Sequence, residues 1–169
     1  MTVYAEAAQR LRTLVTFLEA EGIPIPRTEL TGNLGEWLVM DRLIERGYEP
    51  TLYSAQHDYD IELADGTRVE VKSGQYDVED SLWRFDNIYP DRFDILVAVK
   101  FKDEFEQEVF YLFDADETAN LPPRTMTNPD DERRLIRLRE DPTRHRRSDM
   151  QTLNERITRH RDAWEKIHS

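Results

Sequence analysis

Residues 58–72 read D-Y-D-I-E-L-A-D-G-T-R-V-E-V-K, and the fold that we expect depends on this stretch. Polar and apolar residues alternate along 58–63 and again along 68–72, with Asp65-Gly66 between the two runs. Alternation with a period of two on both sides of a glycine-containing turn predicts a β-hairpin. One face would be apolar, with Tyr59, Ile61, Leu63, Val69 and Val71. The other face would be charged, with Asp58, Asp60, Glu62, Arg68, Glu70 and Lys72.

The length of the turn decides which charged side chains meet. A two-residue turn would place Asp60 opposite Val71, so that Asp60 and Glu70 would point to different faces. A three-residue turn at 64–66 places Asp60 opposite Glu70, and Asp58 opposite Lys72. We expect the three-residue turn because it keeps both apolar sets on one face, and because Gly66 suits its left-handed position.

Two carboxylates that face each other across a hairpin repel, so a cation should lie near them. A divalent metal would serve, because Mg²⁺ prefers oxygen ligands and often takes only one or two carboxylates. The simpler interpretation is a solvated sheet face on which Lys72 or Arg68 forms salt bridges with the acids. For the hairpin taken alone, both interpretations stay open.

A predicted helix upstream adds a third acid, Glu36, on the flank of its apolar stripe. Glu36 on a helix, then Asp60 on one strand, then Glu70-Val71-Lys72 on the next strand resembles the PD-(D/E)XK nuclease superfamily over about residues 30–113. The resemblance implies a restriction-endonuclease-like α/β fold, with an αβββαβ core and a central mixed β-sheet flanked by helices. No proline precedes the aspartate, which leaves open whether Asp58 or Asp60 is the metal ligand.

The resemblance also implies a site and an activity. Asp60, Glu70 and the Val71 carbonyl would hold Mg²⁺ or Mn²⁺, and Lys72 and Glu36 would complete the catalytic set. The activity would be endonucleolytic hydrolysis of phosphodiester bonds, with DNA expected over RNA. The alternative is a catalytically silent nuclease-fold protein that serves as a nucleic-acid- or protein-binding regulatory module. We expect no role for His57, although it adjoins the hairpin.

The charge of the chain is uneven. The formal net charge is −12, yet residues 131–169 hold eleven Lys and Arg against eight Asp and Glu, a local +3. Phosphate binding requires basic surface, so Arg144, Arg146 and Arg147 are the predicted nucleic-acid contacts. The alternative is that the arginines of this segment pair with nearby acids.

We expect a single nuclease-like domain over 1–169, made of an N-terminal helix and linker (1–28), a core (29–113) and a polar segment with a C-terminal helix (114–169). Helices are predicted at 4–21, from 29 or 31 to 46, and at 149–167. Strands are predicted at 49–54, 92–101 and 107–113. Residues 132–139 are predicted as a strand or a helix, with the strand favoured, and 81–85 as a strand or a lid.

The chain has no cysteine, which excludes disulfides and thiolate metal sites. It also lacks an apolar run of membrane-spanning length. We therefore expect a soluble, cytoplasmic protein that does not bind membranes, with a homodimer as its candidate assembly.

Overall fold

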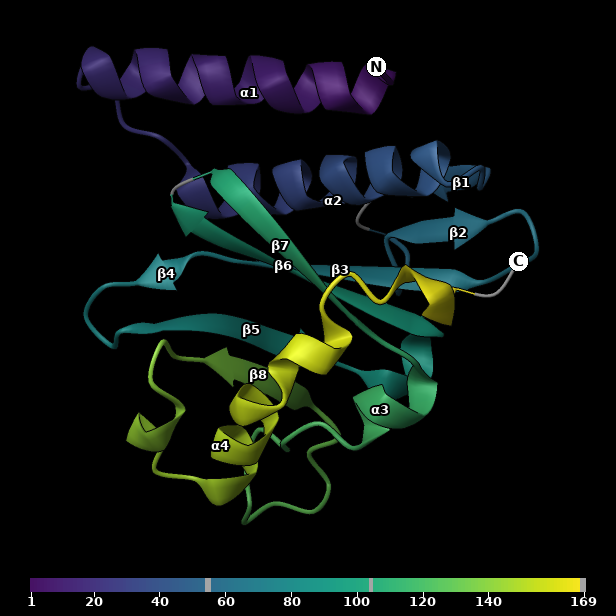
Figure 1. Ribbon diagram of the computed structural model, residues 1–169, viewed down its shortest axis with the longest axis vertical. Coiled ribbons are helices and arrows are strands. Elements are labelled where there is room, and N and C mark those ends of the chain that lie inside the picture. Colours follow the sequence, from purple (N-terminus) through teal and green to yellow (C-terminus); the bar gives the residue numbers. More distant parts are fainter. Residues whose placement is uncertain (54–55, 104, 168–169) are drawn as a thin grey trace.

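The computed structural model describes residues 1–53, 56–103 and 105–167. Two helices, α1 (Val3–Ala20) and α2 (Arg27–Glu45), lie above a five-stranded sheet (Figure 1). The strand order in this sheet is β1-β2-β3-β6-β7, and only β3 and β6 run parallel. The bounds of these strands are Pro50–Leu52, Ile61–Leu63, Arg68–Gly74, Ile95–Asp103 and Glu106–Phe113. The α/β class and the mixed sheet with flanking helices are therefore confirmed.

A second sheet lies below the first and has the order β4-β5-β8, with bounds Tyr76–Asp77, Leu82–Ile88 and Arg134–Leu138. The connection from β3 to β6 contains β4, β5 and a 3-10 turn, where the expected αβββαβ order has a helix. The reason is the period-two pattern of this segment. Trp83 and Phe85 face the core, and a helix could not bury both while leaving Arg84 outside.

The interior strand β6 separates two cores. Val97 and Val99 pack with α1 and α2, whereas Leu96 and Ala98 pack with the second sheet. Strands that are buried on both faces are apolar at nearly every position, as predicted for this segment. Because β3 is in register with β6, Glu70 lies beside Leu96 and Lys72 beside Ala98, on the face toward the second sheet.

The hairpin has the predicted three-residue turn. The Gly66 amide donates to the Leu63 carbonyl at 2.9 Å, and Gly66 has φ = +87°. The observed register pairs Ile61 with Val69. The first strand is shorter than predicted, however, because residues 58–60 form a bend before β2 begins at Ile61, although the Asp60 amide still donates to the Val69 carbonyl at 3.1 Å. Tyr59 therefore leaves the predicted apolar face and packs on the second core.

One further prediction about the helices was wrong. The helix expected at 149–167 ends early, since α4 spans Ser148–Glu155 and 3-10 turns follow. The reason is pairing with the edge of β7, where the Asp162 amide donates to the Phe110 carbonyl at 2.9 Å.

A short helix, α3 (Ala115–Ala119), was missed in the polar segment. Its capping box, in which Asp114 and Glu117 bond each other's backbone amides, is a D-x-x-E signal that the sequence contains. No helix in the described part of the chain combines the length and apolar character that a membrane span requires.

Candidate active site

The site begins where α2 lies against β3. Gly35 of α2 faces Ser73 of β3 so closely that a Cβ atom at position 35 would overlap the Ser73 Oγ. This close approach needs glycine, and it brings the next residue, Glu36, to the edge of β3. Glu36 is half-buried there.

Asp60 occupies the edge of β3 that the short β2 leaves free. Its Oδ2 accepts a hydrogen bond from the Val71 amide at 2.7 Å, so the side chain replaces a strand partner. The N–H and C=O of one strand residue point to the same side. The Val71 carbonyl therefore also faces the Asp60 side of the strand.

Glu70 and Lys72 project from the same face of β3, and the Lys72 Nζ lies 2.5 Å from the Glu70 Oε1. The expected pairing of Lys72 with Asp58 was wrong. Asp58 is largely exposed and bonds Arg92 at 3.1 Å instead, because residues 58–60 do not continue the strand. It is thus Asp60, and not Asp58, that lies beside Glu70.

The three acids perturb one another. Burial raises the pKa of Glu36 to about 7, and the nearby Asp60 and Glu70 add to the shift. Burial likewise raises the pKa of Glu70 to about 7, although Lys72 opposes it. Burial also raises the pKa of Asp60, and the charge of Asp60 adds to the shift at Glu70. The three carboxyl groups therefore hold their protons to higher pH than exposed acids do, and a cation among them would favour their ionised forms.

Asp60, Glu70 and Lys72 open into a cavity of about 240 Å³. Its wall includes residues that the sequence did not assign to the site: His57, Asn87, Tyr89, Arg92 and Phe93. Asn87 has φ = +55°, a conformation that is uncommon outside glycine. Arg92 stacks on the Tyr89 ring at 4.0 Å. In the sequence, Asn87, Tyr89, Arg92 and Phe93 were marked only by their position in the segment that leads into β6.

The donor set fits a small, hard cation. Over residues 1–53, 56–103 and 105–167, no three His, Asp, Glu or Cys side chains are arranged to hold a metal ion. The site instead offers two carboxylates and the Val71 carbonyl. That set suffices for Mg²⁺, which keeps several waters and is completed by substrate phosphate oxygens.

The predicted arginines lie elsewhere. Arg144, Arg146 and Arg147 contribute to a second cavity of about 410 Å³, between β5, β8 and the loop before α4. Arg147 is committed to the fold, because it pairs with Asp149 at 2.6 Å and donates to the Pro123 carbonyl at 2.9 Å.

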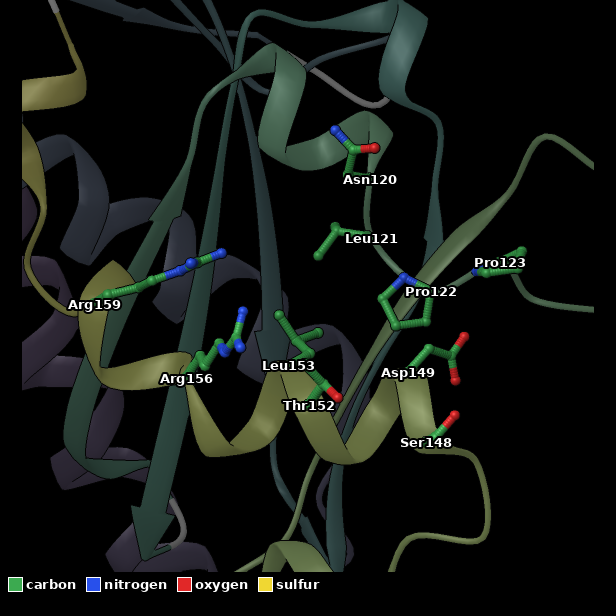
Figure 2. Close-up of a pocket in the computed structure, with 10 residues that line it drawn as sticks. All are labelled: Asn120, Leu121, Pro122, Pro123, Ser148, Asp149, Thr152, Leu153, Arg156 and Arg159. Atoms are coloured by element: carbon green, nitrogen blue, oxygen red, sulfur yellow. The ribbon is translucent and has the colours of Figure 1, made fainter.

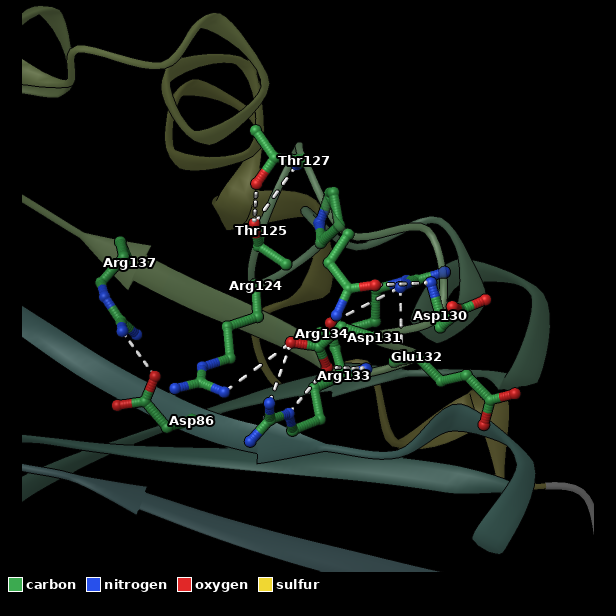
Figure 3. Close-up of polar contacts among 12 residues, drawn as sticks. Asp86, Arg124, Thr125, Thr127, Asp130, Asp131, Glu132, Arg133, Arg134 and Arg137 are labelled. Atoms are coloured by element: carbon green, nitrogen blue, oxygen red, sulfur yellow. Dashed lines mark hydrogen bonds and ion pairs between the residues drawn. The ribbon is translucent and has the colours of Figure 1, made fainter.

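Other arginines of residues 131–169 form bonds within the fold, which agrees with the alternative that they pair with nearby acids. Figure 3 shows Arg133 bonded to Asp131 at 2.7 Å and Arg137 bonded to Asp86 at 2.5 Å. Arg134 donates to backbone carbonyls, among them that of Glu132. The local excess of positive charge is therefore partly internal to the fold.

A further cavity, of about 420 Å³, lies between residues 120–123 and α4 (Figure 2). Arg156 and Arg159 line it together with Leu121 and Leu153, so the wall is mixed apolar and basic. None of the predicted site residues reaches this cavity. The acidic cluster and this pocket are thus separate features.

Comparison with known proteins finds similarity at the level of the fold. No protein-family model matches the chain, and no curated protein is significantly similar to it. Solved structures do match. One is the bacterial homing endonuclease I-Ssp6803I, with 21% sequence identity, a TM-score of 0.57, and coverage of 83% of this chain and 92% of that chain. At this identity the likeness concerns the fold alone.

Proposed function

We propose that the chain is a metal-dependent nuclease of the PD-(D/E)XK type that hydrolyses phosphodiester bonds in DNA. The observation that carries the proposal is the half-buried Asp60 next to Lys72 and the buried Glu70, at one edge of β3 and on the wall of one open cavity. The fold supports it, because the similar solved structure is a bacterial homing endonuclease.

Asp60, Glu70 and the Val71 carbonyl would hold Mg²⁺ or Mn²⁺. When bound, the ion supplies Lewis-acid activation of a water and of the scissile phosphate. Lys72 would stabilise the negative charge that develops on the phosphate, since its ammonium group is fixed in the cavity by Glu70. Glu36, with its raised pKa, would accept the proton that the attacking water releases.

The alternative function is a silent nuclease-fold binding module. Two observations favour it: the close Glu70–Lys72 pair already neutralises part of the site, and the net charge of −12 opposes binding of a polyanion. Replacement of Lys72 separates the two functions.

Lys72→Ala should lower the rate of DNA cleavage by about 10²–10³-fold, as expected for a lost electrostatic donor in the transition state. DNA affinity should change little, because other phosphate contacts supply it. Lys72→Arg should rescue only part of the rate, since the planar guanidinium does not replace a compact ammonium. Single-turnover cleavage and fluorescence anisotropy measure the two quantities.

The assay is best run near pH 8.5 with Mn²⁺, because loss of Lys72 raises the pKa of Glu70 further and would otherwise impair metal binding. Lys102→Ala is the matched control, as Lys102 is exposed on β6 and does not line the cavity. Wild-type protein that binds metal and DNA yet cleaves no DNA would establish the binding module instead.

A further inference from the structure

The second cavity collects positive charge in a chain that is acidic overall. Its wall holds six arginines and one histidine against a single acid, Asp80. The basic residues are Arg84, Arg137, Arg139, Arg144, His145, Arg146 and Arg147. Three further acids, Asp77, Asp86 and Asp149, pair with these arginines from outside the wall. Six arginines against four acids leave a local charge of +2.

Two of the arginines face each other. Arg84 of β5 lies directly opposite Arg137 of β8 on the outer face of the second sheet. Like charges in this position destabilise a sheet. The guanidinium groups are nevertheless fixed by acids, Arg84 by Asp77 and Asp80 and Arg137 by Asp86. These ion pairs offset the repulsion and fix both guanidinium groups, so the charge that is available to an anion comes mainly from the other arginines of the wall.

Arg144 and Arg146 have donors to spare. Both are exposed, and within the described residues neither side chain has a hydrogen bond or an ion pair. The exposed Arg144 and Arg146 line the same cavity as the fixed pair, so an incoming phosphate group would meet both.

A β-bulge in β5 lies between this cavity, called the arginine cavity below, and the cavity at Asp60 and Glu70, called the acidic cavity. The register between β5 and β8 shifts between Phe85 and Ile88, and both of these residues are buried. The extra residue lets Asp86 and Asn87 both point outward, on the same face as Arg84. Arg84 lines the arginine cavity and Asn87 lines the acidic cavity. Arg84 and Asn87 are three positions apart along β5, which corresponds to about 10 Å.

We propose that the two cavities bind one nucleic-acid strand. A backbone phosphate lies in the arginine cavity against Arg144 and Arg146, while a nearby phosphodiester of the same strand lies at Asp60 and Glu70. Asn87, on the bulge between them, contacts the intervening backbone. The proposal deepens the proposed function and rests on it for the choice of DNA.

The test is DNA affinity as a function of salt. Arg144→Gln with Arg146→Gln should weaken binding of a fluorescein-labelled 20-base-pair duplex at least tenfold at about 50 mM KCl. The slope of log affinity against log salt should become shallower by about 2, since each lost phosphate contact contributes roughly 0.9. Both arginines lack side-chain partners, so the melting temperature should not change.

The matched control is Arg10→Gln with Arg27→Gln. It removes the same charge from α1 and α2, on the opposite side of the main sheet, where both arginines form exposed ion pairs. The DNA affinity of this control should stay within twofold of wild type, and the slope of its salt dependence should not change. Equal losses in the two double variants, or no loss in either, would overturn the proposal.

Cleavage of the same duplex distinguishes this proposal from the proposed function. If the Arg144 and Arg146 variant loses affinity and wild type never cleaves, the binding track stands and the nuclease activity fails. If wild type cleaves and the variant binds and cleaves as well as wild type does, the nuclease stands and the track is wrong.

Discussion

Glu70 shows how a single side chain carries both the chemistry and a cost in stability. It is 9% exposed, lies against Asp60, and retains its proton to higher pH than an exposed glutamate. A carboxyl group whose pKa is raised by folding binds more protons in the folded state than in the unfolded state. The free energy of unfolding therefore falls as the pH rises from about 4.5 to about 7.

Glu70→Gln should flatten this decline, because the neutral amide has no proton to lose. Melting curves between pH 5 and 8 in EDTA measure the effect. Glu79→Gln, at an exposed position, should keep the wild-type dependence. A steeper decline in the Glu70 variant would mean that the carboxylate stabilises the fold instead.

Bound metal should reverse the pH dependence that Glu70 gives to the stability of the fold. Ligands must be deprotonated to hold a metal, so the rise in melting temperature on adding Mn²⁺ should grow with pH through about 7. Glu70→Gln should abolish the rise at every pH. A Mn²⁺ response that survives in this variant would place the metal elsewhere.

At the scale of elements, the contact of α2 with β3 positions Glu36. Gly35→Ala should lower the free energy of unfolding by about 1–3 kcal/mol, because the added methyl group overlaps the Ser73 side chain. Ser73→Ala should restore part of the loss in the double variant. The Ser73 Oγ has no hydrogen-bond partner, so its removal alone costs little.

Gly32→Ala is the matched control on the same helix. A Cβ at position 32 meets no atom within 4 Å, so this variant should gain roughly 0.5–1 kcal/mol from helix propensity. Urea denaturation measures all four variants. Equal losses at positions 32 and 35 would show that close packing is not the reason for Gly35.

At the scale of the whole molecule, the net charge of −12 is the dominant feature. Self-repulsion destabilises a compact state and is screened by salt, with a Debye length of about 10 Å at 0.1 M and 3 Å at 1 M. Raising KCl from about 0.05 to 0.5 M should therefore raise the melting temperature in the absence of metal. Choline chloride should act alike, and a fall in both salts would mean that surface ion pairs outweigh the repulsion.

DNA binding should respond to salt in the opposite direction. Contacts with phosphates release counterions, so affinity falls as salt increases even while the fold becomes more stable. The local charge of +2 at the arginine cavity should therefore affect the salt dependence of DNA affinity, whereas the overall charge of −12 should affect the salt dependence of the melting temperature.

Local patterns in the sequence determined the hairpin, its three-residue turn, the double-faced strand β6 and the pairing of Ile61 with Val69. Each of these depends on period-two alternation or on a glycine with positive φ, which neighbouring residues decide. The same register brought Asp60 and Glu70 to one edge of β3, and the grouping of Glu36 with them followed from element order.

The tertiary structure alone decided the rest of both cavities. Residues 58–60 bend away from the predicted strand, so Asp58 pairs with Arg92 and Lys72 pairs with Glu70. The residues after α4 bond the edge of β7 and do not stay helical. A bulge between Phe85 and Ile88 turns Asn87 outward beside Arg84. These outcomes depend on partners distant in sequence, whose hydrogen bonds and charges become available only when the two sheets pack together.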